Sequence, residues 1–134
     1  MKLIMTGAMM ALSATTAGAQ GALTLACTGT VKDHILDSVE KVQTGVIVNF
    51  QARQITGLLA GWDARIDRID DTSIAFSGIS SKSRSPVLTD GGGGSIDRIT
   101  GSLVANIFAW ERGKTEPTTN YSVDLICKPA QRLF

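Results

Sequence analysis

Apolar residues alternate with polar or small residues in several short segments of the chain. Residues 23–27 follow this pattern up to Cys27, and residues 121–127 follow it up to Cys127. Side chains along a strand point to opposite faces in turn, so a period of two is typical of a strand with one buried face. Both segments are therefore expected to be β-strands that direct a cysteine into the core.

Similar segments recur along the chain and are separated by turn-forming residues such as Asp70-Asp71-Thr72. The expected strands cover residues 23–29, 45–50, 55–58, 64–69, 73–78, 95–99, 103–110 and 121–127. Short strands at such regular intervals are typical of all-β folds. The sequence predicts a mainly β protein, a small antiparallel β-barrel or sandwich of about seven or eight strands.

Residues 31–42 are the one segment that indicates a helix. Val31, Ile35, Val39 and Val42 fall at helical spacing. Gly29-Thr30 and Thr44-Gly45 are suitable boundaries for it. The pattern predicts one short helix, with a β-connection carrying a loose loop as the alternative.

The motif Ile66-Asp67-Arg68-Ile69 recurs as Ile96-Asp97-Arg98-Ile99. Two copies of four residues do not establish a repeat architecture. We interpret each copy as a strand that runs into a hairpin turn, with the isoleucines inward and the Asp-Arg pair at the rim.

The first 19 residues have the features of a secretory signal peptide. Lys2 precedes an apolar stretch at residues 3–12, and Ala17-Gly18-Ala19 suits cleavage before Gln20. The apolar stretch is shorter than the roughly 20 residues of a spanning helix. We expect a signal peptide at residues 1–19, a single exported β domain at residues 20–134 with no transmembrane segment, and a periplasmic or secreted location.

The two cysteines are expected to form a disulfide between the first and the last strand. Exported proteins fold in oxidising compartments, where a cysteine pair in phase with the core is normally bridged. A lipid-modified Cys27 is the alternative, but Thr24 occupies the place where a lipobox has leucine, and Cys127 would have no partner.

Charge excludes two classes of partner. The chain has 13 basic and 12 acidic residues, and removal of residues 1–19 takes away Lys2 and no acidic residue, which leaves 12 of each. The charges are interspersed, whereas nucleic acids and anionic membrane surfaces reward clustered Lys and Arg. Neither is an expected partner.

Catalytic groups are sparse. His34 is the only histidine, and no serine lies in a Gly-x-Ser-x-Gly elbow. The carboxylates of residues 63–71 are interpreted as a charged loop, and His34 with nearby aspartates is a weak metal-ligand set. We predict no catalytic, metal or cofactor site; an enzyme that relies on Asp67 and Asp97 is the weakest alternative.

Two features are candidates for a contact surface. The run Gly91, Gly92, Gly93 and Gly94 lacks the Gly-Lys-Ser/Thr of a phosphate-binding loop, so we interpret residues 80–95 as a mobile recognition loop. Trp62 and Trp110 stand at expected strand ends, where they are either binding anchors or side chains that close the core.

Three segments carry a resemblance to known proteins: residues 25–29, residues 96–101 and residues 121–129. They are similar to a group of small, uncharacterised exported bacterial proteins with one disulfide. In size, export and cysteine placement the chain also resembles the periplasmic and lipid-anchored inhibitors of C-type lysozyme. This resemblance implies a compact antiparallel barrel, and Ser77-Gly78 matches the dipeptide of the inhibitory loop in those proteins.

Together these features predict a non-catalytic binding or inhibitor-like module whose partner is an envelope protein or glycan. The alternative is a carrier of a small apolar ligand in the interior of the barrel. Whether side chains fill the barrel decides between the two.

Overall fold

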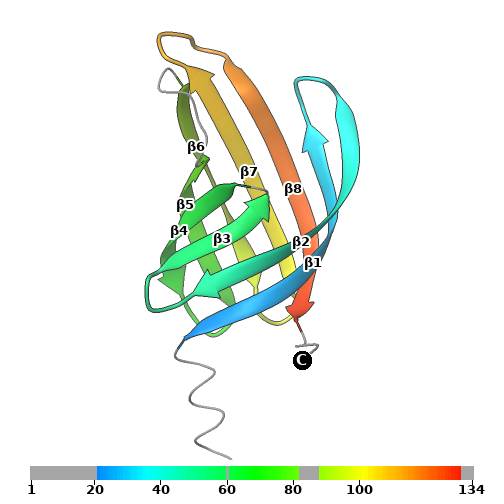
Figure 1. The fold of residues 1–134 in the computed structure, drawn as a ribbon, viewed down its shortest axis with the longest axis vertical. Helices are drawn as coiled ribbons and strands as arrows, with labels where there is room; N and C mark the ends of the chain where they lie inside the picture. The colour runs from blue at the N-terminus through cyan, green and yellow to red at the C-terminus, as the bar shows by residue number, and fades with distance from the viewer. Residues whose placement is uncertain (1–20, 60, 82–87, 131–134) are drawn as a thin grey trace, which may run out of the picture.

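The computed structural model describes residues 21–59, 61–81 and 88–130, which form a closed antiparallel barrel of eight strands (Figure 1). The strands are β1 (Ala22–Asp33), β2 (Ser38–Asn49), β3 (Gln54–Leu59), β4 (Trp62–Ile69), β5 (Ser73–Ser81), β6 (Leu88–Asp97), β7 (Ser102–Glu111) and β8 (Pro117–Pro129). Each strand pairs with the next, and β8 returns beside β1. The prediction of a mainly β protein, an antiparallel barrel or sandwich of about seven or eight strands, is confirmed, and the structure is the barrel. The expected signal peptide at residues 1–19 lies outside the described residues. The described residues contain no helix that is long and apolar enough to cross a membrane.

Aliphatic side chains fill the barrel interior. The largest fully buried side chains are those of Ile55, Leu58, Ile79, Leu103, Ile107, Leu125, Val46, Val48, Val123 and Cys27. No charged or polar residue of the described part is buried with them. Because each fully buried aliphatic side chain contributes roughly 1.5–3 kcal/mol, this core supplies much of the driving force for folding.

The disulfide lies at the seam where the first strand meets the last. Cys27 and Cys127 are bonded and stand directly opposite each other in the β1–β8 register, with their Cα atoms 4.0 Å apart. The Cys127 N–H donates to the Gly101 carbonyl on the β7 side, so the cysteines form a non-hydrogen-bonded pair, the type with the closest side chains. The predicted bridge is confirmed.

The prediction of a helix over residues 31–42 is wrong, because this segment is the β1–β2 hairpin. Asp33 explains the turn: its Oδ1 accepts hydrogen bonds from the N–H groups of Ile35 and Leu36, at 2.9 and 3.1 Å. Asp37 then takes a positive φ of 53°, which returns the chain. A side chain that satisfies the turn amides competes directly with helix formation.

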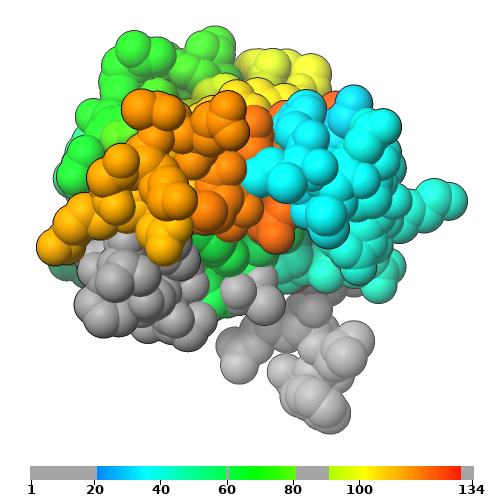
Figure 2. All heavy atoms as spheres, turned by 90° about the horizontal axis from the view of Figure 1, so that it is seen from above, coloured from blue at the N-terminus to red at the C-terminus, as the bar shows by residue number. Residues whose placement is uncertain are grey.

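The wall of the barrel is uneven in height. β3 has 6 residues, whereas β1 and β2 have 12 each, and β2 pairs with β3 only from Ile47 to Asn49. In Figure 1 the β3–β4 hairpin ends partway up, while the β1–β2 and β7–β8 hairpins reach the top. Figure 2, seen from above, shows these two tips side by side, in cyan and orange. Among the described residues, the upper part of β2 therefore has no strand beside it on the side of β3.

The lower end is braced by two capped turns. Asp70 accepts from the N–H groups of Thr72 and Ser73, and Asp97 accepts from those of Ile99 and Thr100. Both copies of the Ile-Asp-Arg-Ile motif lead into these turns, as predicted. Ile99, however, is 74% exposed, because the second copy leaves its strand at Asp97.

The two turns are also bonded to each other. The Arg98 guanidinium donates to the Asp70 carbonyl over 2.7 Å, and the Arg98 N–H donates to the Thr72 carbonyl. The lower end is thus held by hydrogen bonds between hairpins.

Removal of the disulfide is expected to lower the free energy of unfolding by about 3 to 5 kcal/mol, because the bridge closes a loop with a sequence separation of 100 residues. The measurement is urea denaturation of the oxidised protein and of the double variant Cys27→Ala, Cys127→Ala. A difference below about 1 kcal/mol would contradict a stabilising seam.

The Asp70 carboxylate makes the lower end sensitive to acid. Hydrogen bonds from the turn, first from the Thr72 N–H, lower the pKa of Asp70 from 3.8 to about 2. A carboxyl whose pKa is lower in the folded state stabilises the fold above its unfolded pKa. That contribution is lost as pH falls from about 4 to about 2.

Denaturation of Asp70→Asn between pH 2 and pH 6 tests this contribution. The free energy of unfolding of the wild type should fall more steeply than that of Asp70→Asn below about pH 4. Asp71→Asn removes the same charge from an adjacent exposed position and serves as the control. Parallel curves for wild type and Asp70→Asn would contradict the prediction.

Candidate functional site

A groove of about 300 Å³ lies at the open upper end of the barrel. Its walls are the β1–β2 hairpin, Leu59 at the end of β3, and Tyr121 on β8. The lining residues are Val31, Asp33, Leu36, Ser38, Glu40, Val42, Leu59 and Tyr121. The groove exists because β3 stops short of the strands on either side of it.

The groove combines an apolar floor with two carboxylates. Asp33 is occupied by the turn amides of Ile35 and Leu36. The Glu40 carboxylate, by contrast, has neither a hydrogen bond nor an ion pair with any residue that the structure describes. Among the described residues, no lysine or arginine lines the groove, so the groove suits a donor or a cation carried on an apolar ligand.

Large aliphatic side chains are exposed at the tip of the same hairpin. Ile35 is 49% exposed, Leu36 is 75% exposed and Val39 is 65% exposed. Ile35 and Val39 are two of the four residues whose spacing predicted a helix over residues 31–42. Exposed apolar side chains gathered on one element beside a groove mark an interaction surface.

A row of polar contacts fastens this hairpin to the barrel. The His34 N–H donates to the Asn120 carbonyl over 2.9 Å, and His34 Nε2 lies 2.6 Å from Ser122 Oγ. The Ser122 hydroxyl donates to Asn106 Oδ1 over 3.1 Å. His34, Ser122 and Asn106 thus form one hydrogen-bonded row that joins the β1–β2 turn to β8 and β7.

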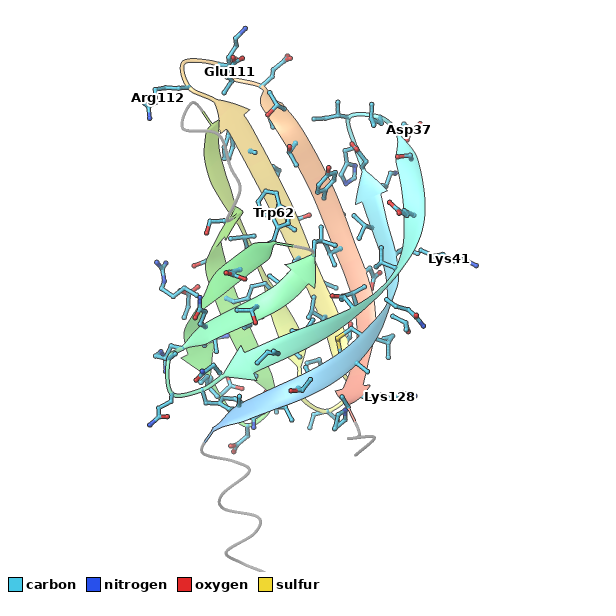
Figure 3. All side chains as sticks on the ribbon, in the orientation of Figure 1. Asp37, Lys41, Trp62, Glu111, Arg112 and Lys128 are labelled. Atoms are coloured by element: carbon cyan, nitrogen blue, oxygen red, sulfur yellow. A yellow bond between two sulfur atoms is a disulfide. The ribbon has the colours of Figure 1, made fainter. Side chains whose placement is uncertain are left out.

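Trp62 does not line the groove. It faces the core from the upper end of the β3–β4 hairpin and packs half-buried against the aliphatic cluster (Figure 3). Of the two roles predicted for it, the packing corresponds to closure of the core.

Trp110 lies elsewhere, on β7, where its ring stacks on that of Phe108 with centroids 5.7 Å apart. A Cβ on Gly91 would meet the Trp110 ring at 3.2 Å, so Gly91 lies beneath it. The structure thus brings together Trp110 and Gly91 but not Trp62. Phe108, two positions before Trp110, was not singled out from the sequence.

The prediction of a loop at Gly91, Gly92, Gly93 and Gly94 is wrong, since all four lie in β6 and pair with β7. A Cβ on Gly94 would lie 2.1 Å from the Val104 carbonyl oxygen and 2.8 Å from the Phe76 ring. These residues are glycines because β6 lies too close to its neighbours for side chains. Residues 82–87 of the expected loop lie outside the described part of the chain.

The carboxylates at residues 63–71 are not gathered into one site. Asp67 pairs with Arg65 at 3.5 Å, and Asp70 caps the turn that follows. Among the described residues, no group of three or more His, Cys, Asp or Glu side chains is arranged to hold a metal ion. Ser77 lies within β5 rather than in a loop, and its hydroxyl accepts a hydrogen bond from Arg65.

Comparison with known proteins adds no assignment: no family model, curated protein or solved structure matches the chain. The site therefore rests on its geometry.

Substitution of Gly94 tests the close approach of β6 and β7. Gly94→Ala is expected to lower the free energy of unfolding by about 2 kcal/mol, because the new Cβ meets backbone and a buried ring. Gly45→Ala is the matched control, since a Cβ there meets nothing within 4 Å. Equal stability of the two variants in urea denaturation would contradict the steric account.

Proposed function

We propose that this protein is an exported, non-catalytic binding module that holds its partner at the open end of the barrel. The observation that carries the proposal is the exposure of Ile35, Leu36 and Val39 on one hairpin beside the groove. Exposed aliphatic side chains carry a free-energy cost in water that contact with a partner removes.

The shape of the hairpin supports this use. The turn is fixed by Asp33, and the hairpin is joined to β8 through His34. A tip held in one conformation loses little entropy when it binds, which favours affinity.

Export is part of the proposal. It is supported by the signal-like residues 1–19 and by the disulfide, a bond that persists in oxidising compartments.

The packed interior argues against the alternative of a small apolar ligand carried deep inside the barrel. The inward positions of the lower barrel hold aliphatic side chains that are fully buried. The open groove is better suited to an envelope protein or glycan, because its Glu40 carboxylate has no hydrogen bond or ion pair with the described residues. Inhibition of an enzyme is one way in which such a module acts, and C-type lysozyme is the first enzyme to assay.

Leu36→Ser tests the binding surface. The tagged, oxidised protein is used to capture partners from an envelope extract, which are identified by mass spectrometry, and the affinity of the purified partner is then measured. Leu36→Ser should weaken that affinity at least about tenfold, the effect of losing a central apolar contact. Because Leu36 is 75% exposed, the variant should keep the stability of the wild type.

Ile99→Ser is the matched control, because Ile99 is 74% exposed at the opposite end of the barrel. It should bind the partner as the wild type does. Equal affinity of Leu36→Ser and wild type, or no partner enriched over bare resin, would overturn the proposal.

A further inference from the structure

The upper half of β2 is an open strand edge within a barrel that is closed below. β2 pairs with β1 along its whole length, but with β3 only from Ile47 to Asn49. The Thr44 hydroxyl still reaches the Gly57 carbonyl over 2.6 Å, and there β3 turns away at Gly57 with a φ of 87°. Above this point the side of β2 that faces away from β1 has no neighbouring strand among the described residues.

The register shows which backbone groups face this edge. The Gly45 carbonyl oxygen points toward β3, since a Cβ on Gly57 would lie 2.2 Å from it. Backbone groups on a strand face alternate sides, so Gln43, Lys41 and Val39 direct their N–H and C=O groups the same way. No backbone partner for them occurs within residues 21–59, 61–81 and 88–130.

The side chains along the edge form two rows, each with one charged residue. Ser38, Glu40 and Val42 face the groove. Val39, Lys41 and Gln43 face outward, and Figure 3 shows Lys41 projecting away from the barrel. A strand added here would meet Glu40 and Val42 with its inner side chains and Lys41 with an outer one.

These charges disfavour a second copy of the chain as the occupant. When two copies of this edge pair antiparallel about a two-fold axis, the residue on the axis lies opposite the same residue of the other copy. If the pairing uses the whole edge, that residue is Glu40 or Lys41. Either centre sets a charge directly opposite its own copy, which is destabilising. Charge at an open edge is a common defence against such self-association.

Building on the proposed function, we propose that the edge of β2 at residues 38–43 binds an extended peptide segment that continues the sheet where β3 leaves it. The segment places a lysine or arginine against Glu40, an acidic residue against Lys41 and an aliphatic residue against Val42. Backbone hydrogen bonds supply affinity and the alternate side chains supply specificity, as in other complexes that add a strand to a sheet. The groove receives the inner side chains.

Amide hydrogen exchange followed by NMR tests the edge and its occupant together. In the free protein the amides of Val39, Lys41 and Gln43 should exchange fast, while those of Glu40 and Val42, bonded to β1, should be slow. The probe is the synthetic peptide acetyl-Thr-Leu-Asp-Lys-Ile-Thr-amide at millimolar concentration, which carries the proposed charge pattern and differs from the sequence of β2 itself. It should slow exchange of the three edge amides by about tenfold.

Two control peptides separate the contributions. One carries N-methyl groups on the amides that would face β2 and should give no protection. The other has glutamate in place of the lysine and should bind about three- to tenfold more weakly. Glu40→Lys should weaken binding of the first peptide by a similar factor, while Glu116→Lys, the same charge change on the exposed β7–β8 turn, should leave it unchanged.

Slow exchange of the edge amides in the free, dilute protein would overturn the inference, as would a peptide that gives no protection. Protection that rises with protein concentration would assign the edge to a second copy and would also overturn it. If the peptide gives no protection of the edge amides but Leu36→Ser still weakens partner binding, this inference is wrong and the proposed function stands. If the peptide protects the edge amides but Leu36→Ser binds the partner as tightly as the wild type, the proposed function is wrong.

Discussion

The pairing of β1 with β8 is the constraint on which the rest of the structure depends. Without it the eight strands form an open sheet with two free edges, and the aliphatic side chains on its inner face would lie in water. The Cys27–Cys127 bond fixes this pairing at a position where the two strands already face each other. β1 thus holds β2 on one side and β8 on the other, and the long β1–β2 hairpin stands on that base.

Differences in strand length explain why the barrel is closed at its lower end and open at its upper end. Capped turns and the bond from Arg98 to the Asp70 carbonyl join the lower hairpins. At the upper end β3 diverges at Gly57, which leaves β1 as the one neighbouring strand of the upper part of β2 among the described residues. The groove follows from this mismatch, and Glu40 in its lining has no hydrogen bond or ion pair with the residues that the structure describes.

The alternation of apolar and polar residues predicted the barrel and the disulfide, because both depend on which face of a strand a side chain occupies. Cys27 and Cys127 were in phase with the inward residues, and a closed barrel brings its first and last strands together. The spacing of Val31 and Ile35 misled, because a local hydrogen bond from Asp33 to turn amides determines the hairpin. A run of glycines predicts a loop from the sequence alone, because the steric need for Gly94 comes from Val104 and Phe76 on the neighbouring strands. The groove was not predicted, since it depends on how far β3 extends along β2.

The seam also has a consequence for how the chain is made. Its two partner cysteines are separated by 100 residues, so the N-terminal strand has no final neighbour until the last strand has been synthesised. Contacts this distant in sequence slow folding, because a long loop must be closed before they can form. The order of its strands therefore delays closure of the barrel until the whole chain is available.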